Sequence, residues 1–327
     1  MSANEFEVIG PGAALLSPYR IDGRPDGEIL RIGAVQCAWN PDPIEHRDVV
    51  RRGVHLAAEQ GARVVVLQEL TLSPYFCAVP DVPDALVTYG EDIETGPTPA
   101  MARELAAELG IWVHASLYER TADDRGFNTA ICVEPSGRLV TRTRKTHIPE
   151  FPYYHEDRYF EPADQDCSVV EVAGASFAFP TCWDQWFPEL ARALSMDGAQ
   201  VIVYPTAIGN EPHMPDADTQ PMWRQMIAAN GLANSTFMVA INRIGTEGPL
   251  TFYGSSFISD PYGRVLVEAP RDRPAVLIAD LDLAQRDDAL SFGLMYTRRP
   301  DRYRRLMAST SLGRPADDDP LSTATTR

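Results

Sequence analysis

The sequence of 327 residues lacks several features that define common classes of protein. It has no apolar run approaching the ~20 residues that a membrane-spanning helix requires, and its start lacks the basic and apolar stretches of a secretion signal. Basic residues are few, with 29 Lys and Arg against 46 Asp and Glu, so the net charge is −17. Nucleic acids and anionic membranes both attract basic surfaces, so neither is expected as a partner. We expect a cytoplasmic protein.

Cysteine and histidine are also scarce and scattered. The five cysteines are widely spaced with no CxxC pair, and the six histidines show no HxxxH or HExxH pattern. An odd number of distant cysteines does not indicate a disulfide framework, and the missing pairs leave no zinc-site pattern. A metal-dependent hydrolase is therefore a poor interpretation, and we expect no bound metal.

Hydrophobic residues make up 44% of the chain, which is ample for the core of one large α/β domain or two smaller ones. Residues 29–69 contain a strand, a helix that stops at Gly61 and a second strand that is apolar on both faces. Such a β-α-β unit is typical of a sheet covered on both sides. Strands are expected at 29–36, 63–69, 111–118, 127–134, 138–145, 176–181, 200–205, 236–242, 253–259, 264–268 and 275–281, and helices at 48–60, 100–109, 188–198 and 221–234.

The two ends of the chain differ in composition from the middle. Residues 1–28 are rich in Gly and Pro without periodicity, and are interpreted as an N-terminal arm. Residues 308–327 are rich in Ser, Thr and Asp, which is typical of a flexible or docking tail. The single domain is expected to span 29–307.

Three chemically capable side chains fall at the expected ends of strands. Glu69 ends the second apolar strand, Lys145 ends a later one, and Cys182 lies in a strand-to-helix turn. Each has a plainer interpretation, namely a solvent-facing carboxylate, a surface lysine and a small buried hydrophobic residue. Together, however, they supply what hydrolysis of an amide-like C–N bond needs without a metal: a nucleophile, a group that moves protons, and positive charge for the oxyanion.

The loop at 150–162 has more aromatic surface than a connector needs, so we expect it to form a pocket wall. Its aromatic residues are Phe151, Tyr153, Tyr154, Tyr159 and Phe160.

The segments around these three residues resemble the nitrilase, or carbon–nitrogen hydrolase, superfamily. The motifs are Leu67-Gln-Glu-Leu70, Arg144-Lys-Thr-His-Ile-Pro149 and Cys182-Trp-Asp-Gln-Trp-Phe-Pro-Glu189. Within the superfamily, the sequence most resembles the branch of the N-carbamoylputrescine amidohydrolases, on three further segments: Tyr204-Pro-Thr-Ala-Ile-Gly209, Asn242-Arg-Ile-Gly245 and Thr251-Phe-Tyr-Gly254.

The resemblance implies an α/β fold, a four-layer αββα sandwich, with no cofactor and with homo-oligomers built from dimers. It also implies a cysteine nucleophile at Cys182, a base at Glu69, and Lys145 at the oxyanion. Glu156 matches the second glutamate of the family, which positions the lysine and substrate, and the backbone N–H of Trp183 would be a second oxyanion donor. Cleavage of a small carbamoyl or amide substrate would pass through a thioester that water then hydrolyses.

The segment after the cysteine, residues 183–186, has no cation to pair with a substrate carboxylate. An unpaired buried charge is costly, so a cationic or neutral substrate tail is favoured, as in N-carbamoylputrescine. The alternatives are N-carbamoyl-β-alanine, an ω-amide, a nitrile, or a non-catalytic scaffold on the same fold. Candidates for the tail end of the pocket, with packing or interface contact as the plainer interpretation, are Asp184, Tyr154, Glu211 and Trp223.

Two departures from the resembled branch put the substrate in question. Pro180 stands in the expected strand before the cysteine, where it would remove a hydrogen-bond donor from the strand ladder and shift the approach of the nucleophile. Phe151 and Tyr153 stand where that branch has small glycines, so a bulkier pocket wall is expected.

Overall fold

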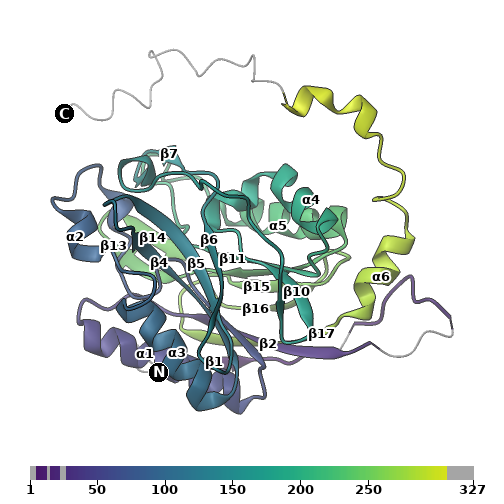
Figure 1. Cartoon of the computed structure of the whole chain (residues 1–327), viewed down its shortest axis with the longest axis horizontal. Helices are drawn as coiled ribbons and strands as arrows, with labels where there is room; N and C mark the ends of the chain where they lie inside the picture. Colours follow the sequence, from purple (N-terminus) through teal and green to yellow (C-terminus); the bar gives the residue numbers. More distant parts are fainter. Residues whose placement is uncertain (1–4, 13–14, 23–26, 308–327) are drawn as a thin grey trace.

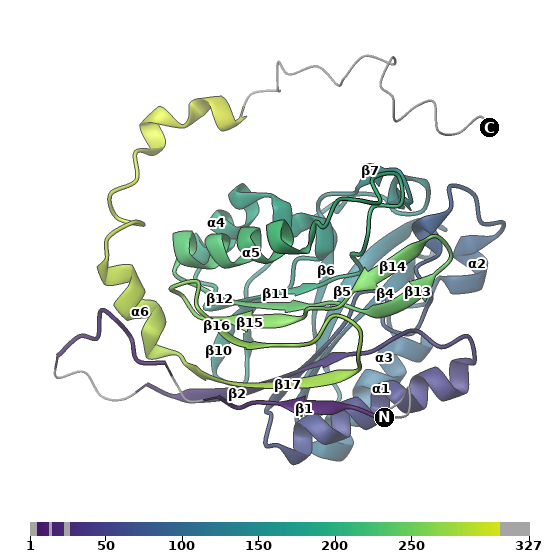
Figure 2. The ribbon, with the colours of Figure 1, turned by 180° about the vertical axis from the view of Figure 1, so that it is seen from behind.

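Two β-sheets pack face to face, and a layer of helices covers the outer side of each (Figures 1 and 2). The computed structural model describes residues 5–12, 15–22 and 27–307. The expected αββα sandwich is therefore confirmed.

The first sheet has seven strands in the order β1-β17-β2-β3-β4-β5-β6. Its members are β1 (Glu7–Ile9), β2 (Ile29–Gln36), β3 (Val64–Leu67), β4 (Trp112–Arg120), β5 (Gly126–Val133), β6 (Leu139–Arg144) and β17 (Ala275–Asp282). Strands β2, β3 and β4 are parallel, as the β-α-β pattern predicts, whereas β5 and β6 return by hairpins.

The second sheet has six strands in the order β16-β15-β12-β11-β10-β9. Its members are β9 (Val170–Val172), β10 (Ala175–Ala178), β11 (Val201–Pro205), β12 (Phe237–Ile241), β15 (Phe257–Ser259) and β16 (Val265–Glu268). Two small hairpins stand apart from both sheets: β7 (Glu150–Phe151) with β8 (Tyr154–His155), and β13 (Ile244–Glu247) with β14 (Leu250–Tyr253).

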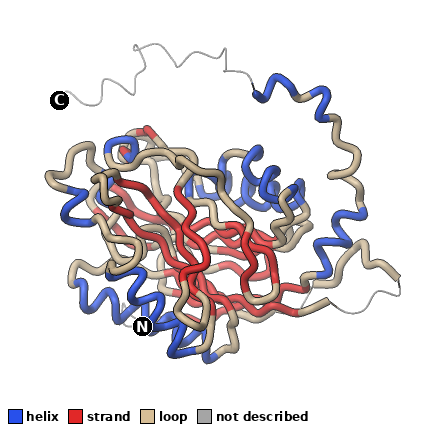
Figure 3. The backbone as a smooth tube through the Cα atoms, viewed as in Figure 1, coloured by secondary structure: helices blue, strands red, loops and turns tan. Residues whose placement is uncertain are grey.

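Among the described residues, helices form the outer layer on each side of the sandwich (Figures 1 and 3). On the first sheet lie α1 (Pro43–Glu59) and α3 (Pro97–Leu109), and on the second lie α4 (Pro188–Met196) and α5 (Gln220–Asn234). The short helices are α2 (Ala85–Tyr89) and α6 (Ala284–Ser291). None of the helices in the described ranges is both long and apolar enough to cross a membrane.

Helix α1 begins earlier than the expected residue 48, because its cap lies before the apolar periodicity. The Asp42 carboxylate accepts hydrogen bonds from the backbone N–H groups of Ile44 and Glu45, and Pro43 occupies the first helical position.

The core between the sheets is apolar and continuous. It includes Val66 of β3, Phe177 of β10 and Leu277 of β17, all fully buried. Separate apolar clusters join each sheet to its own helices. The shared core fixes the two sheets against each other, and the strand ends that carry the candidate site are thereby held in place.

The strand before the cysteine is shorter than expected, which corrects the interpretation of Pro180. β10 ends at Ala178, so Pro180 lies outside the ladder and removes no ladder hydrogen bond. The buried segment from Phe179 to Thr181 instead leads into the turn that carries Cys182.

The described residues of the N-terminal arm contact the sandwich. β1 pairs in parallel with β17 at the edge of the first sheet, with Glu7 opposite Ala275. Phe6 packs over α1 at Gly53, where a methyl group would lie 3.1 Å from the Phe6 ring. Further along, the Ser17 hydroxyl lies 2.7 Å from that of Tyr262. The expected tail at 308–327 lies outside the described residues.

Candidate active site

Glu69, Lys145 and Cys182 all follow strands. Glu69 lies just beyond β3, Lys145 directly follows β6, and Cys182 opens a 3₁₀ turn (Cys182–Trp186) after β10. Because β3 and β6 run in the same direction, their carboxyl ends open at the same edge of the first sheet. The fold therefore brings residues 69 and 145 together although 76 positions separate them.

A buried cluster of three charged groups forms at this edge. The Lys145 ammonium donates to Glu69 Oε1 at 2.9 Å and to Glu156 Oε2 at 2.6 Å. All three side chains are almost completely shielded from solvent. A buried charge is costly unless it is paired; the one ammonium contacts both carboxylates but balances the charge of only one of them.

Two residues that sequence reasoning missed complete the hydrogen bonding of the cluster. The Asn128 side-chain amide donates to Glu69 Oε1 at 2.7 Å, and the Tyr75 hydroxyl donates to Glu156 Oε1 at 2.8 Å. Glu69 Oε2 is buried and has no partner among the described residues. That oxygen is the free acceptor that a general base requires.

The pKa values in the cluster follow from burial and neighbouring charge. Burial alone would lower the pKa of Lys145, but the carboxylates of Glu156 and Glu69 outweigh it and raise the pKa well above its usual value. Burial, opposed by Lys145, raises the pKa of Glu156 to about 7. The lysine is thus held as a cation, the form that stabilises an oxyanion.

Cys182 is 6% exposed and has a strained backbone, with φ of 41° in the left-handed region. A non-glycine residue held there costs on the order of 1–3 kcal/mol, and such strain is concentrated at functional sites. Burial and the charge of Glu69 raise the pKa of the thiol well above its usual value, against the lowering effect of Lys145. This shift favours the protonated thiol, which would need a base in order to act as a nucleophile.

A cavity of about 310 Å³ opens over Cys182. Its wall is mainly apolar and includes Phe151, from the aromatic loop, and Trp183, directly after the cysteine. Tyr153 is not part of this wall. The remaining lining residues are Pro149, Tyr154, Glu156, Trp186, Ile208, Glu211, Met214, Thr219 and Met222.

Two of the four substrate-binding candidates lie in this cavity wall, Tyr154 and Glu211. The Tyr154 hydroxyl accepts a hydrogen bond from the backbone N–H of Gly209 at 3.0 Å. Glu211 is 8% exposed, and its buried Oε2 has no partner among the described residues. Burial raises the pKa of Glu211 to about 7.

The other two candidates, Asp184 and Trp223, do not line the cavity, so the structure corrects their placement. Both are fully buried. The Trp223 indole N–H donates to Gln185 Oε1 at 2.9 Å and so stabilises the turn that carries Cys182. The Asp184 carboxylate accepts hydrogen bonds from backbone N–H groups on both sides of the site, including that of His147 at 2.9 Å.

Arg243 is a further residue whose role the sequence left undefined. It is fully buried, and its guanidinium donates to the backbone carbonyls of Glu69 at 2.8 Å and Leu70 at 3.0 Å. It also pairs with Glu247 at 2.6 Å. Arg243 therefore fixes the backbone of the loop that carries the candidate base.

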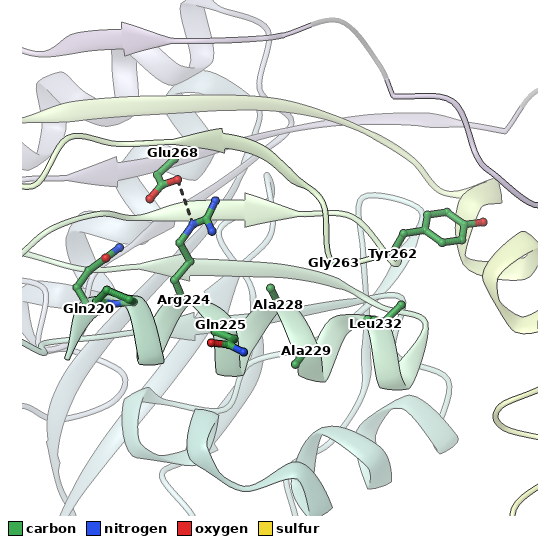
Figure 4. A pocket seen from close by; sticks show the side chains of 10 residues that line it. Gln220, Arg224, Gln225, Ala228, Ala229, Leu232, Tyr262, Gly263 and Glu268 are labelled. Carbon is green, nitrogen blue, oxygen red and sulfur yellow. Dashed lines mark hydrogen bonds and ion pairs between the residues drawn. The ribbon is translucent and has the colours of Figure 1, made fainter. Parts of the chain in front are cut away.

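A second hollow, of about 660 Å³, lies along α5 beside Tyr262 and Glu268 (Figure 4). Its two charged lining residues, Arg224 and Glu268, pair with each other at 3.1 Å. It contains no nucleophile or buried charge cluster comparable with the site at Cys182. Within the described ranges, no group of three or more His, Cys, Asp or Glu side chains is placed to hold a metal ion.

Comparison with known proteins shows that this fold and site belong to hydrolases that act on carbon–nitrogen bonds other than peptide bonds. Residues 31–289 match the family described as carbon-nitrogen hydrolase. The chain belongs to this family, and the resemblance drawn from its motifs is confirmed.

The relatives include proteins with different substrates in their names. The chain is 35% identical to an N-carbamoylputrescine amidase of Arabidopsis thaliana over 84% of this chain and 94% of that one. It is 32% identical to a citrullinase of Francisella tularensis, over 84% and 96% of the two chains. Among solved structures, a carbon–nitrogen hydrolase from Helicobacter pylori G27 is similar with a TM-score of 0.80 and 28% identity, over 86% of this chain and 99% of that one.

Proposed function

We propose that the protein hydrolyses an N-carbamoyl amine with a cationic tail, such as N-carbamoylputrescine, to the amine, carbon dioxide and ammonia. The observation that carries this proposal is Glu211, a carboxylate with an unpartnered buried oxygen in an otherwise mainly apolar cavity above Cys182. A methylene chain suits the apolar wall, and a terminal ammonium suits the carboxylate.

In the proposed reaction, the Cys182 sulfur attacks the carbamoyl carbon while Glu69 Oε2 takes the thiol proton. The carbonyl oxygen becomes an oxyanion that faces the Lys145 ammonium and the backbone N–H of Trp183. Glu69 then passes the proton to the leaving nitrogen, so that ammonia departs and a carbamoyl thioester remains on Cys182.

Water completes the proposed reaction. Glu69, again a carboxylate, takes a proton from the water as its oxygen attacks the thioester carbon, and the proton then returns to the sulfur. The released carbamate decomposes to carbon dioxide and the free amine. Glu156 supports both halves of the reaction because its contact with Lys145 keeps the ammonium directed at the oxyanion position.

The lining of the cavity favours an amine over a carboxylate at the tail. None of its described lining residues is an arginine or lysine, and a buried substrate carboxylate without a cation would be unfavourable. This argues against N-carbamoyl-β-alanine. Citrulline, named for one relative, carries both an ammonium and a carboxylate and is the informative intermediate case.

The test is an ammonia-release panel with N-carbamoylputrescine, L-citrulline, N-carbamoyl-β-alanine, an ω-amide and a nitrile. We expect the highest kcat/KM for N-carbamoylputrescine, and no release by a folded Cys182→Ala variant. A preference for N-carbamoyl-β-alanine would overturn the substrate assignment. Substantial activity in Cys182→Ala would overturn the mechanism.

A further inference from the structure

We propose that Asp184 is a positioning residue that sets the nucleophile Cys182 against the oxyanion lysine, Lys145. The proposal rests on the proposed function for the roles of these two residues. In this proposal Asp184 links the two sheets and does not contact the substrate, which was the role considered from the sequence.

The Asp184 carboxylate bridges the two segments that carry the reacting groups. Its Oδ2 accepts from the backbone N–H of Thr181, directly before the nucleophile, at 3.0 Å. Its Oδ1 accepts from the backbone N–H of His147 at 2.9 Å, two residues beyond Lys145. The N–H of Thr146, adjacent to Lys145, lies 3.4 Å from Oδ2.

The side chain of His147 adds a fourth contact, because its Nδ1 lies 2.7 Å from Asp184 Oδ1. A carboxylate only accepts, so this nitrogen carries the proton. The four donors thus engage both oxygens of a fully buried side chain, which leaves Asp184 no role as a direct substrate contact.

The bridge connects segments that follow strands of different sheets. Lys145 follows β6 of the seven-stranded sheet, whereas Cys182 follows β10 of the six-stranded sheet. Apolar contacts between sheets are non-directional, but hydrogen bonds to one carboxylate fix distance and angle. Asp184 therefore supplies directional contacts across the gap between the sheets.

Asp184 also closes the strained turn. Its own backbone N–H donates to the Thr181 carbonyl at 3.0 Å, while its side chain accepts from the Thr181 N–H. Cys182 lies between these two bonds with φ of 41°. Strain of this kind persists only where surrounding contacts enforce it, so the same residue holds the nucleophile in its unusual conformation.

The direct test is Asp184→Asn, which keeps the shape but replaces one acceptor oxygen with an NH₂ donor. Two of the four donors then lose their acceptor: the two His147 nitrogens if Oδ1 is replaced, or the backbone N–H groups of Thr181 and Thr146 if Oδ2 is replaced. We expect kcat for N-carbamoylputrescine to fall about 10²-fold, the scale for a reacting group displaced by about 1 Å, with KM changed less than about threefold because the cavity wall is intact. Carbamidomethylation of Cys182 by iodoacetamide, followed by peptide mass spectrometry, should also slow.

The matched control is Asp260→Asn. Asp260 is equally buried and accepts from the backbone N–H groups of Tyr262 and Arg264, both at 2.9 Å, in the turn between β15 and β16. Both variants should lower the melting temperature, but assayed well below it only Asp184→Asn should lose kcat. Equal losses in the two variants, or wild-type kcat in Asp184→Asn, would overturn the proposal.

His147→Ala keeps the test decisive if Asp184→Asn does not fold. It removes one of the four contacts from a partly exposed side chain, so kcat should fall severalfold with KM unchanged. Unchanged kcat in this variant would then count against the proposal. If the wild-type protein releases no ammonia from any compound in the panel, the proposed function is refuted. Labelling of Cys182 by iodoacetamide needs no substrate, so comparing the labelling rates of the variants still tests the role of Asp184.

Discussion

At the scale of single residues, the proposed function makes the ionisation of Glu211 a determinant of substrate choice. Its carboxyl is protonated below about pH 7 and ionised above, because burial raises its pKa to about 7. Only the ionised form attracts an ammonium. Affinity for a cationic substrate should therefore increase as the pH rises through 7.

We predict that kcat/KM for N-carbamoylputrescine, divided by that for the neutral analogue N-butylurea, increases between pH 6 and pH 8. Ionisation of the catalytic groups changes kcat/KM for both substrates equally, so its effect cancels in the ratio. These groups include Glu156, which also has a raised pKa. Glu211→Gln should lower the ratio at pH 8 by about ten- to hundredfold, the factor equivalent to ~1.5–3 kcal/mol for a charged hydrogen bond, and should abolish its pH dependence. A pH-dependent ratio in Glu211→Gln would show that another group senses the ammonium.

At the same scale, the sequence pointed to the three candidate catalytic residues but not to the residues that support them. Glu69, Lys145 and Cys182 carry uncommon chemistry at recognisable strand ends, so their residue types attracted attention. Asn128 and Tyr75 complete the cluster from within a strand and a loop, where a polar or aromatic residue has many plainer uses. Asp184 was a candidate for the tail end of the pocket but does not line the cavity, because spacing alone does not show which way a side chain points.

At the scale of elements, strands and helices with strong periodicity were predicted well and short ones were not. Helix α5 and strand β2 begin and end within one residue of expectation. The expected strand at 253–259 is instead the end of β14 and then β15, separated by a turn with Gly254 and Ser255 at positive φ. Strand β1 has only three residues and pairs with a strand more than 260 positions away, so no local pattern could reveal it.

The arm should contribute to stability through Phe6. We predict that Phe6→Ala lowers the free energy of unfolding by about 1–2 kcal/mol, less than the ~3–5 kcal/mol for a fully buried phenylalanine because Phe6 is only partly buried. Chemical denaturation measures the change. Leu16→Ala is the control, since Leu16 is 76% exposed and its loss should change little; an equal effect in both variants would contradict the predicted packing of the arm.

At the scale of the whole molecule, the shared core makes the two sheets interdependent. We infer that residues 29–307 fold as one domain, because the central core takes side chains from both sheets. The expected homo-oligomer stays a prediction, to be measured by light scattering.

Thermal unfolding should therefore show a single transition by far-UV circular dichroism and by tryptophan fluorescence. Phe177→Ala, at a fully buried position between the sheets, should destabilise the protein by about 3–5 kcal/mol and shift both signals equally. Two separate transitions, or a shift in one signal alone, would indicate that the sheets unfold independently.

The buried state of Cys182 also determines how the protein withstands oxidation. Peroxide reacts with thiolates in accessible positions, whereas Cys182 is 6% exposed and its raised pKa keeps it protonated. In the proposed mechanism the sulfur becomes strongly nucleophilic when Glu69 accepts its proton in the course of attack. The resting enzyme therefore keeps its nucleophile in the form that oxidants attack slowly, and its activity should persist in aerated solution without added reductant.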